Sequence, residues 1–346
     1  MPTWPAGDAS VTDSPIFVVG FGRSGTTLLQ AVLGAHPRIA APPEVRFVAE
    51  IVAHADAWGD LHDDAVLRKV ITTAVKAPRL RRAGWDVDRL VERALTRPRD
   101  FPNVIDTIMS DFAERNGKVR WAEKTPLDLA GDIWALFPDA QVIHIVRHPE
   151  QNIPSHVEKL GIFRTIGEAA FFWRRFTERN ERDGAERGAS HFLRLRYEDL
   201  TADPETVLRQ VFAFLREDYD AQVVNDPSRR AATIGRGNEF VNEVLEPIRP
   251  AESVDPGRLS PTDRRRIAAA TRPAMRLVGY PEPPRRDVLV GRLINVPTHT
   301  WLSTRHWFQQ ATAAVRTPRQ RLRAHDKRKQ QRMQRLREAA QKAEGN

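Results

Sequence analysis

The sequence contains no cysteine, and it has only three tyrosines and four methionines among 346 residues. Without cysteine, disulfide bonds and thiolate metal sites are excluded, and a reducing compartment such as the cytoplasm is expected. No apolar run approaches the roughly 18 residues of a membrane-spanning helix. The first residues also lack the basic start and apolar centre of a secretory signal. Because 41% of the residues are apolar, the chain can still form a sizeable globular core.

Positive charge is concentrated at one end of the chain. Residues 285–346 hold 15 Lys and Arg against 4 Asp and Glu, whereas the whole chain has a net charge of +9. The part before residue 285 is therefore slightly acidic, and its composition gives no reason to expect nucleic acid as a partner. We divide the chain into a short N-terminal lead over residues 1–14, a main domain over residues 15–284 and a basic helical extension over residues 285–346.

The most informative stretch begins at Pro15 and predicts a strand, a turn and a helix. Ile16–Val19 is an unbroken apolar run, as expected of a strand covered on both faces. Three glycines follow within six residues, and the residues from Thr26 to Leu33 have apolar side chains at helical spacing. A glycine-rich turn that leads into a helix can bind an anion, because backbone N–H groups and the helix dipole converge there.

The turn has the spacing of a Walker A loop but not its lysine. Gly20 and Gly25 are separated by four residues, but Thr26 stands where that motif has lysine, and Arg23 lies inside the loop. Without the lysine, transfer of an ATP γ-phosphoryl group loses its main charge stabiliser. The loop still suits a terminal phosphate or sulfate. A plain strand-to-helix turn is the alternative interpretation.

A second buried strand is predicted at Val142–Val146, and it ends at Arg147-His148-Pro149. Open α/β sheets bind their ligands at the carboxyl ends of strands. Ser155 follows Arg147 by eight residues. An arginine and a hydroxyl at this place can bind a phosphate group, although an ordinary serine after a strand and a turn would give the same pattern.

These segments resemble sulfotransferases that use 3′-phosphoadenosine 5′-phosphosulfate (PAPS). Arg23–Leu29, with the sequence Arg-Ser-Gly-Thr-Thr-Leu-Leu, is similar to the loop of the Golgi carbohydrate and tyrosylprotein enzymes and their bacterial relatives. Matching segments extend from about Pro15 to Tyr280. The resemblance implies an α/β fold with a P-loop-like parallel sheet and helices on both faces. It also implies that a sulfuryl group is transferred to an acceptor hydroxyl, with 3′,5′-ADP as product and no bound metal.

The resemblance also assigns residues to the nucleotide. Those matching the 5′-phosphosulfate site are Arg23, Ser24, Gly25, Thr26, Thr27, Leu28 and Lys124, the last within a Lys-x-Pro element. Arg147 and Ser155 match the 3′-phosphate site, and Tyr197 in Arg-Tyr-Glu-Asp-Leu would lie near the nucleotide. A late loop usually carries a basic residue and a tryptophan. Arg258 matches the basic position, with Arg236 as a competitor, but no tryptophan follows it.

Glu44 is the candidate general base. Together with Arg46 it forms a Glu-x-Arg element 21 residues after Arg23, similar to the tyrosylprotein enzymes, in which the glutamate is the base. An acceptor hydroxyl must lose its proton as it attacks sulfur. The resemblance places Lys124 near the leaving oxygen, where an ammonium would offset developing charge. A surface ion pair between Glu44 and Arg46 is the alternative, and His148 is not expected to be the base.

Residues 50–116 are predicted to form a helical insertion beside the acceptor site. Apolar residues recur at helical spacing over Asp64–Ala77 and Asp86–Leu95. The nearby Arg79, Arg81 and Arg82 are expected to form a solvated basic face. The acceptor is expected to be a carbohydrate, a lipid or a related alcohol.

The basic extension is open to two interpretations. Trp301, Trp307 and Phe308 precede a strongly basic stretch. This pattern fits either a peripheral anchor on an anionic membrane, at its inner face, or a solvated tail.

Two alternatives to a sulfotransferase remain: a P-loop-type kinase or nucleotide hydrolase, and a non-catalytic, membrane-associated module that binds a nucleotide.

Overall fold

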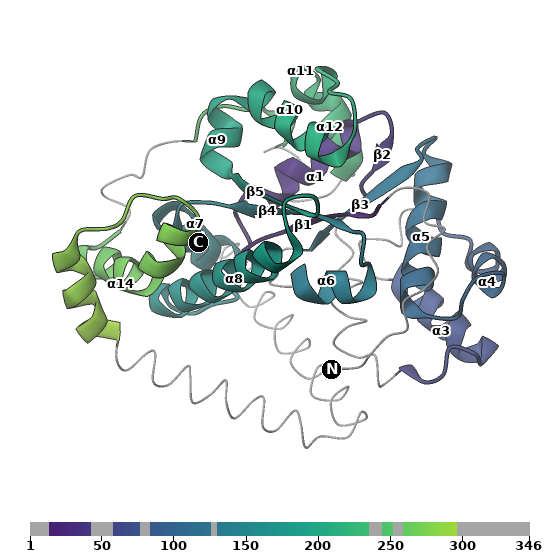
Figure 1. Cartoon of the computed structure of the whole chain (residues 1–346), viewed down its shortest axis with the longest axis horizontal. Coiled ribbons are helices and arrows are strands. Elements are labelled where there is room, and N and C mark those ends of the chain that lie inside the picture. The colour runs from purple at the N-terminus through teal and green to yellow at the C-terminus, as the bar shows by residue number, and fades with distance from the viewer. Residues whose placement is uncertain are drawn as a thin grey trace, which may run out of the picture.

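The computed structural model describes residues 14–42, 58–76, 84–125, 130–234, 244–251 and 259–295. Five parallel strands form one sheet in the order β2-β3-β1-β4-β5 (Figure 1). The strands are β1 Ile16–Val19, β2 Ile39–Ala40, β3 Arg120–Thr125, β4 Gln141–Val146 and β5 Phe192–Arg196.

Helices lie on both faces of this sheet and around it (Figure 1). They are α1 Thr26–Ala35, α3 Asp64–Val75, α4 Val87–Leu95, α5 Phe101–Arg115, α6 Ala130–Leu136, α7 Pro149–Leu160, α8 Ile166–Arg187, α9 Tyr197–Ala202, α10 Pro204–Leu215, α11 Gln222–Asn225, α12 Pro227–Ile234 and α14 Pro261–Leu277. A further helix covers residues 285–295.

The central strand β1 is buried on both faces, as its unbroken apolar run predicts. Successive side chains of a strand point to opposite faces of the sheet. Phe17 and Val19 accordingly belong to one hydrophobic cluster, and Ile16 and Val18 belong to another. Since both clusters need covering helices, the sequence of this strand alone requires a layered fold with the sheet in the middle.

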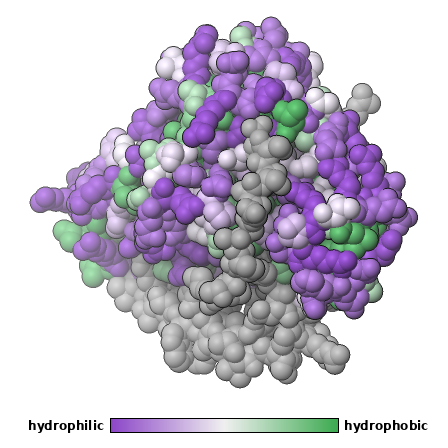
Figure 2. Space-filling model, turned by 45° about the vertical axis from the view of Figure 1, so that its right-hand side comes forward, coloured by the Kyte–Doolittle hydropathy of each residue, from purple (hydrophilic) through white to green (hydrophobic). Residues whose placement is uncertain are grey.

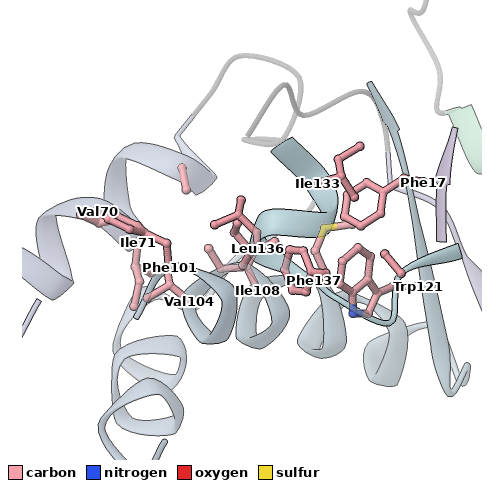
Figure 3. Close-up of a cluster of buried hydrophobic side chains, with 14 of the residues drawn as sticks. Phe17, Val70, Ile71, Phe101, Val104, Ile108, Trp121, Ile133, Leu136 and Phe137 are labelled. Carbon is pink, nitrogen blue, oxygen red and sulfur yellow. The ribbon is translucent and has the colours of Figure 1, made fainter. Parts of the chain in front are cut away.

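The first cluster fills the space between the sheet and helices α3 to α6 (Figure 3). Phe17 packs edge-on against Trp121 of β3, with ring centroids 5.5 Å apart, and it also contacts Phe137. Ile108 of α5 and Ile133 of α6 close this core. The helices α3 to α5 are therefore part of the main core rather than a separate layer on the surface.

The second and third clusters cover the remaining sides of the sheet. Helices α1 and α10 pack against the face formed by Ile16 and Val18. A third cluster joins α7, α8 and α14 around Trp173, which is fully buried. Phe172 and Phe176 of α8 pack against the same cluster.

The predicted α/β fold, a parallel sheet with helices on both faces, is confirmed. α10 begins as its sequence predicts: the Asp203 side chain accepts a hydrogen bond from the Thr206 backbone, and Pro204 occupies the first turn. α3 and α4 match the two predicted helices within two residues at each end. The predicted domain boundaries stay a prediction. Within the described ranges, no helix has both the length and the apolar character needed to cross a bilayer.

Candidate active site

The glycine-rich loop joins the carboxyl end of β1 to the first turn of α1. Gly25 is the N-cap residue of α1 and has a φ of +93°, which is unfavourable for residues with a Cβ. A Cβ there would also lie 2.3 Å from Cδ2 of Tyr197. No side chain caps the helix, so its first N–H groups are donors that a bound anion can satisfy.

Arg23 has an unusual backbone conformation within this loop, with a φ of +69°. Left-handed backbone costs a residue with a side chain roughly 1–2 kcal/mol. The amide nitrogen of Asn152 on α7 lies 3.0 Å from the carbonyl oxygen of Gly22 and 3.0 Å from the hydroxyl of Ser24. Asn152 thus bonds the residues on either side of Arg23. Asn152 is itself fully buried, so these two bonds have no competition from bulk solvent.

The side chain of Arg23 extends to α7. Its Nε donates a hydrogen bond to Oγ of Ser155, at 3.3 Å. Arg147, directly after β4, contacts the same loop, and its Nη1 lies 3.5 Å from the carbonyl oxygen of Arg23. The two segments that the sequence singled out separately therefore meet at one place.

Tyr197 connects both segments. The guanidinium of Arg147 lies over its ring, 4.6 Å from the centroid, and the same ring packs against Gly25. Arg147 also donates a hydrogen bond from Nε to Gln151, at 3.3 Å. This packing orients the guanidinium, because a cation over an aromatic face is attracted by the ring quadrupole.

Lys124 reaches the same loop from the neighbouring strand β3. It is paired with Val18 of β1 in the sheet register, is 5% exposed, and donates from Nζ to Oγ1 of Thr27 at 3.2 Å. Lys124 is the last residue but one of β3. Three cationic side chains, from Arg23, Lys124 and Arg147, thus surround the start of α1.

His148, which follows Arg147 directly, is not suited to accept a proton from a substrate. Burial lowers the pKa of His148, and its ring packs edge-on against Tyr280 with centroids 5.2 Å apart. Its backbone N–H donates to Glu198, whose other carboxylate oxygen accepts from the Tyr280 hydroxyl at 2.6 Å. His148 is thus held by Tyr280 and Glu198, and the expectation that it is not the base stays a prediction.

Two buried residues of this site were not found by sequence reasoning, Asn152 and His156. The ring of His156 contacts the rings of Phe21 and Phe163, and burial followed by the charge of Arg23 lowers its pKa to about 4. Both face the loop because α7 continues through Pro154, which places residues 152, 155 and 156 on one side. A helical assignment for this stretch was the signal that could have revealed them.

Several predicted site residues lie outside the described residues. They are Glu44, Arg46, Arg236 and Arg258. Among the residues that the structure does describe, no three His, Asp or Glu side chains are grouped as a metal site would require.

A polar cavity of about 610 Å³ lies at the opposite edge of the sheet, where the strands begin. Arg120 from the start of β3 lines it and donates to the carbonyl oxygens of Ser14 and Leu215 and to Glu217. These bonds tie the strand starts to α10. The cavity is remote from the loop, and we therefore place the active site at the carboxyl edge of the sheet instead.

Comparison with known proteins identifies the family of the chain. Residues 15–221, more than half of the chain, match the model of the sulfotransferase family. The chain belongs to the sulfotransferase family. The predicted resemblance is thereby confirmed, and both the glycine-rich loop and the Arg147–Ser155 element lie within the matched residues.

Similar proteins include protein-tyrosine sulfotransferases of animals. Protein-tyrosine sulfotransferase 2 of Gallus gallus is 25% identical over 216 residues, covering 58% of this chain and 50% of that protein. Protein-tyrosine sulfotransferase 1 of Danio rerio is 24% identical over 283 residues, covering 77% and 72%. The chain thus matches only half the length of the chicken protein. A solved sulfotransferase domain from the Synechococcus PCC 7002 olefin synthase is 22% identical, with a TM-score of 0.48, covering 83% of this chain and 96% of that domain.

Proposed function

We propose that the protein transfers a sulfuryl group from PAPS to the hydroxyl group of an acceptor. The observation that carries this proposal is the meeting of Arg23, Arg147 and Lys124 around the start of α1, at the carboxyl ends of β1, β3 and β4. A nucleotide with anionic groups at both its 3′ and 5′ positions requires two separate cationic sites within reach of each other. Membership of the sulfotransferase family supports the same donor.

The proposed roles divide the donor between the two segments. The N–H groups at the start of α1, with Thr27 and Lys124, would bind the 5′-phosphosulfate. Arg147, with Ser155, would bind the 3′-phosphate. Arg23 contacts the Ser155 hydroxyl, and its loop leads directly into the first turn of α1, which holds Thr27, so Arg23 is close to both proposed phosphate sites.

In the reaction, the acceptor oxygen forms a bond to sulfur while the bond from sulfur to the bridging phosphate oxygen breaks. The proton of the acceptor hydroxyl passes to Glu44, the proposed general base, and 3′,5′-ADP leaves. The ammonium of Lys124 would stabilise negative charge on the leaving oxygen. The transfer assay described next determines whether the acceptor is a tyrosyl, carbohydrate or lipid hydroxyl.

Binding and transfer are measured separately to test this proposal. We expect 3′,5′-ADP to bind in calorimetry without added metal and more tightly than 5′-AMP, which lacks the 3′-phosphate. Labelled PAPS is then incubated with a tyrosine-containing peptide, a glycan mixture and a lipid extract, and the sulfated product is identified. Glu44→Gln should abolish transfer while 3′,5′-ADP still binds.

The same assays separate the two alternatives. A preference for ATP with Mg²⁺ over PAPS would replace this proposal with a kinase or nucleotide hydrolase. Transfer that is absent, or unaffected by Glu44→Gln with PAPS bound, would contradict the assigned base. A module that only binds nucleotide would show binding without any sulfated product. Attachment to a membrane is a separate proposal, and it rests on the helix over residues 285–295.

A further inference from the structure

The helix over residues 285–295 is fixed on α14 by one of its faces. Val288 is buried, and the Asn295 side-chain amide donates to the carbonyl oxygen of Arg266 at 2.9 Å. A Cβ added to Gly291 would lie only 1.9 Å from the carbonyl oxygen of Arg265, so the two helices are in close contact. Residues 288, 291 and 295 share one side of a helix, and the orientation of the whole element follows from them. Figure 1 shows this yellow-green helix at the outer left edge of the molecule, beside α14.

The opposite face of this helix carries apolar side chains in contact with solvent. Leu289 is 62% exposed, Val290 40% and Leu293 77%. Leu289 and Leu293 are four residues apart and lie side by side on the helix surface. Only eight large apolar residues are exposed in the described part of the chain, and three of them lie on this short helix. In the view of Figure 2, hydrophilic residues cover most of the coloured surface.

Arginines border this apolar face. Arg285, Arg286 and Arg292 are exposed, and none of them forms a salt bridge within the described residues. The acidic residue of this helix, Asp287, is already paired with Arg265 of α14 at 3.3 Å. The outward surface therefore combines leucine and valine side chains with three positive charges and no free carboxylate of its own. We name Arg285, Arg286, Leu289, Val290, Arg292 and Leu293 the basic apolar face.

We propose that the basic apolar face binds the surface of an anionic lipid bilayer. Helices that lie in a membrane interface insert apolar side chains to the level of the acyl chains, while flanking arginines contact the lipid phosphates. Each basic residue near an anionic leaflet contributes about 1 kcal/mol. Charge also argues against pairing between two copies of this face, since a symmetric contact would bring the arginines of both copies together.

The sequence after this helix has the same chemical character. Trp301 and Trp307 follow within 12 residues of Asn295, and basic residues continue to Lys342. Tryptophan is enriched at membrane interfaces because its ring is apolar and its N–H is polar. The proposal itself rests on the described helix, and the experiment separates this helix from the residues that follow it.

Co-sedimentation of the full chain with vesicles tests the proposal. One set of vesicles is phosphatidylcholine alone, and the other contains about one third phosphatidylglycerol. We expect binding to the anionic vesicles only, and weaker binding at high salt because ions screen the arginines. The double variant Leu289→Ser, Leu293→Ser should lower the vesicle affinity at least about tenfold, since two apolar side chains no longer enter the bilayer. The triple variant Arg285→Gln, Arg286→Gln, Arg292→Gln should lower it about a hundredfold.

Matched control variants replace exposed apolar side chains and exposed arginines elsewhere on the surface. Leu95→Ser with Val119→Ser removes two exposed apolar side chains, and Arg68→Gln, Arg209→Gln, Arg249→Gln removes three exposed charges. Both should bind vesicles as the unmodified chain does, and thermal unfolding checks that every variant is folded. Equal loss in the controls would show a general charge effect and overturn the proposal. Unchanged binding of the leucine variant would also overturn it and would assign the affinity to residues 296–346.

Two further outcomes would overturn the proposal. Equal binding to neutral vesicles would remove the role of the arginines. A dimer in gel filtration that the leucine variant converts to a monomer would identify the face as a contact between two copies. The assay contains no nucleotide and no acceptor, so its result does not depend on the proposed sulfuryl transfer.

Discussion

Arg23 and Ser155 are 132 residues apart in the sequence, and the Nε of the arginine donates a hydrogen bond to the serine hydroxyl at 3.3 Å. One belongs to the glycine-rich loop and the other to α7, so the elements proposed for the two ends of the nucleotide contact each other directly. A change in either residue should therefore affect both ends of the ligand.

Ser155→Ala tests this coupling. Removing the hydroxyl deletes one donor to the proposed 3′-phosphate and also the acceptor of Arg23. We expect the affinity for 3′,5′-ADP to fall about ten- to a hundredfold, the value of one hydrogen bond to a charged group. The affinity for 5′-AMP should fall too, by a smaller factor, because Arg23 loses its orientation. Isothermal calorimetry measures both, with Ser190→Ala on the exposed surface as control. Unchanged binding of 5′-AMP would contradict the coupling.

Asn152→Asp tests whether Asn152 maintains the left-handed backbone of Arg23. The aspartate has the same shape but no N–H groups, so it places an oxygen against the carbonyl of Gly22. We expect at least a tenfold loss of 3′,5′-ADP affinity and a destabilisation of about 1–3 kcal/mol. In transfer assays, KM for PAPS should rise more than kcat falls, because Asn152 positions the loop without touching the ligand. Asn116→Asp, an exposed change of the same charge, should alter neither value.

A comparison of two glycine variants isolates the contact between Gly25 and Tyr197. Gly25 and Gly117 both have positive φ values, +93° and +67°, but a Cβ at Gly117 would meet nothing within 4 Å. Gly117→Ala should therefore cost only the backbone strain of about 1–2 kcal/mol. Gly25→Ala adds the overlap with the tyrosine ring and should cost clearly more, with loss of nucleotide binding. Denaturant unfolding at constant pH measures the difference, and equal costs would contradict the close packing.

Acid should destabilise the protein through its buried histidines. The pKa of His156 falls from about 6.5 to about 4 because burial disfavours the charged ring, and the pKa values of His36 and His148 are lowered for the same reason. Below about pH 6.5 these histidines bind protons in the unfolded chain but not in the folded chain. The free energy of unfolding therefore declines as the pH falls from about 6.5 to about 4. His156 alone accounts for up to about 3 kcal/mol of this loss.

His156→Phe measures that contribution. The phenylalanine ring can keep the contacts with Phe21 and Phe163 but cannot be protonated. We expect the decline in free energy of unfolding between pH 6.5 and 4 to be shallower than in the unmodified chain, as followed by urea titrations. His62→Gln serves as the control, because the His62 side chain is 77% exposed. A decline equally steep in the phenylalanine variant would contradict the role of His156.

The sequence predicted the parts of this site that depend on local patterns. The apolar run of β4 located Arg147 at the carboxyl end of a strand, and the glycine spacing located the start of α1. Asn152 and His156 were missed because Pro154 obscured the helix that brings them together with Ser155. The contact of Tyr197 with Gly25 depends on the order of β1, β4 and β5 in the sheet, which no local pattern encodes.

Tyr197 has a consequence for which nucleotides the protein can accept. Its ring touches the glycine that begins α1 and, on the same side chain, supports the guanidinium of Arg147. One rigid aromatic ring therefore contacts both proposed phosphate sites, and we expect the separation between these sites to change little with the ligand. Under the proposed function, the site selects nucleotides by the distance between their charged groups. A nucleotide with phosphates at both the 3′ and 5′ positions can contact both proposed phosphate sites. An adenine nucleotide with all its phosphates at one position can contact only one of them.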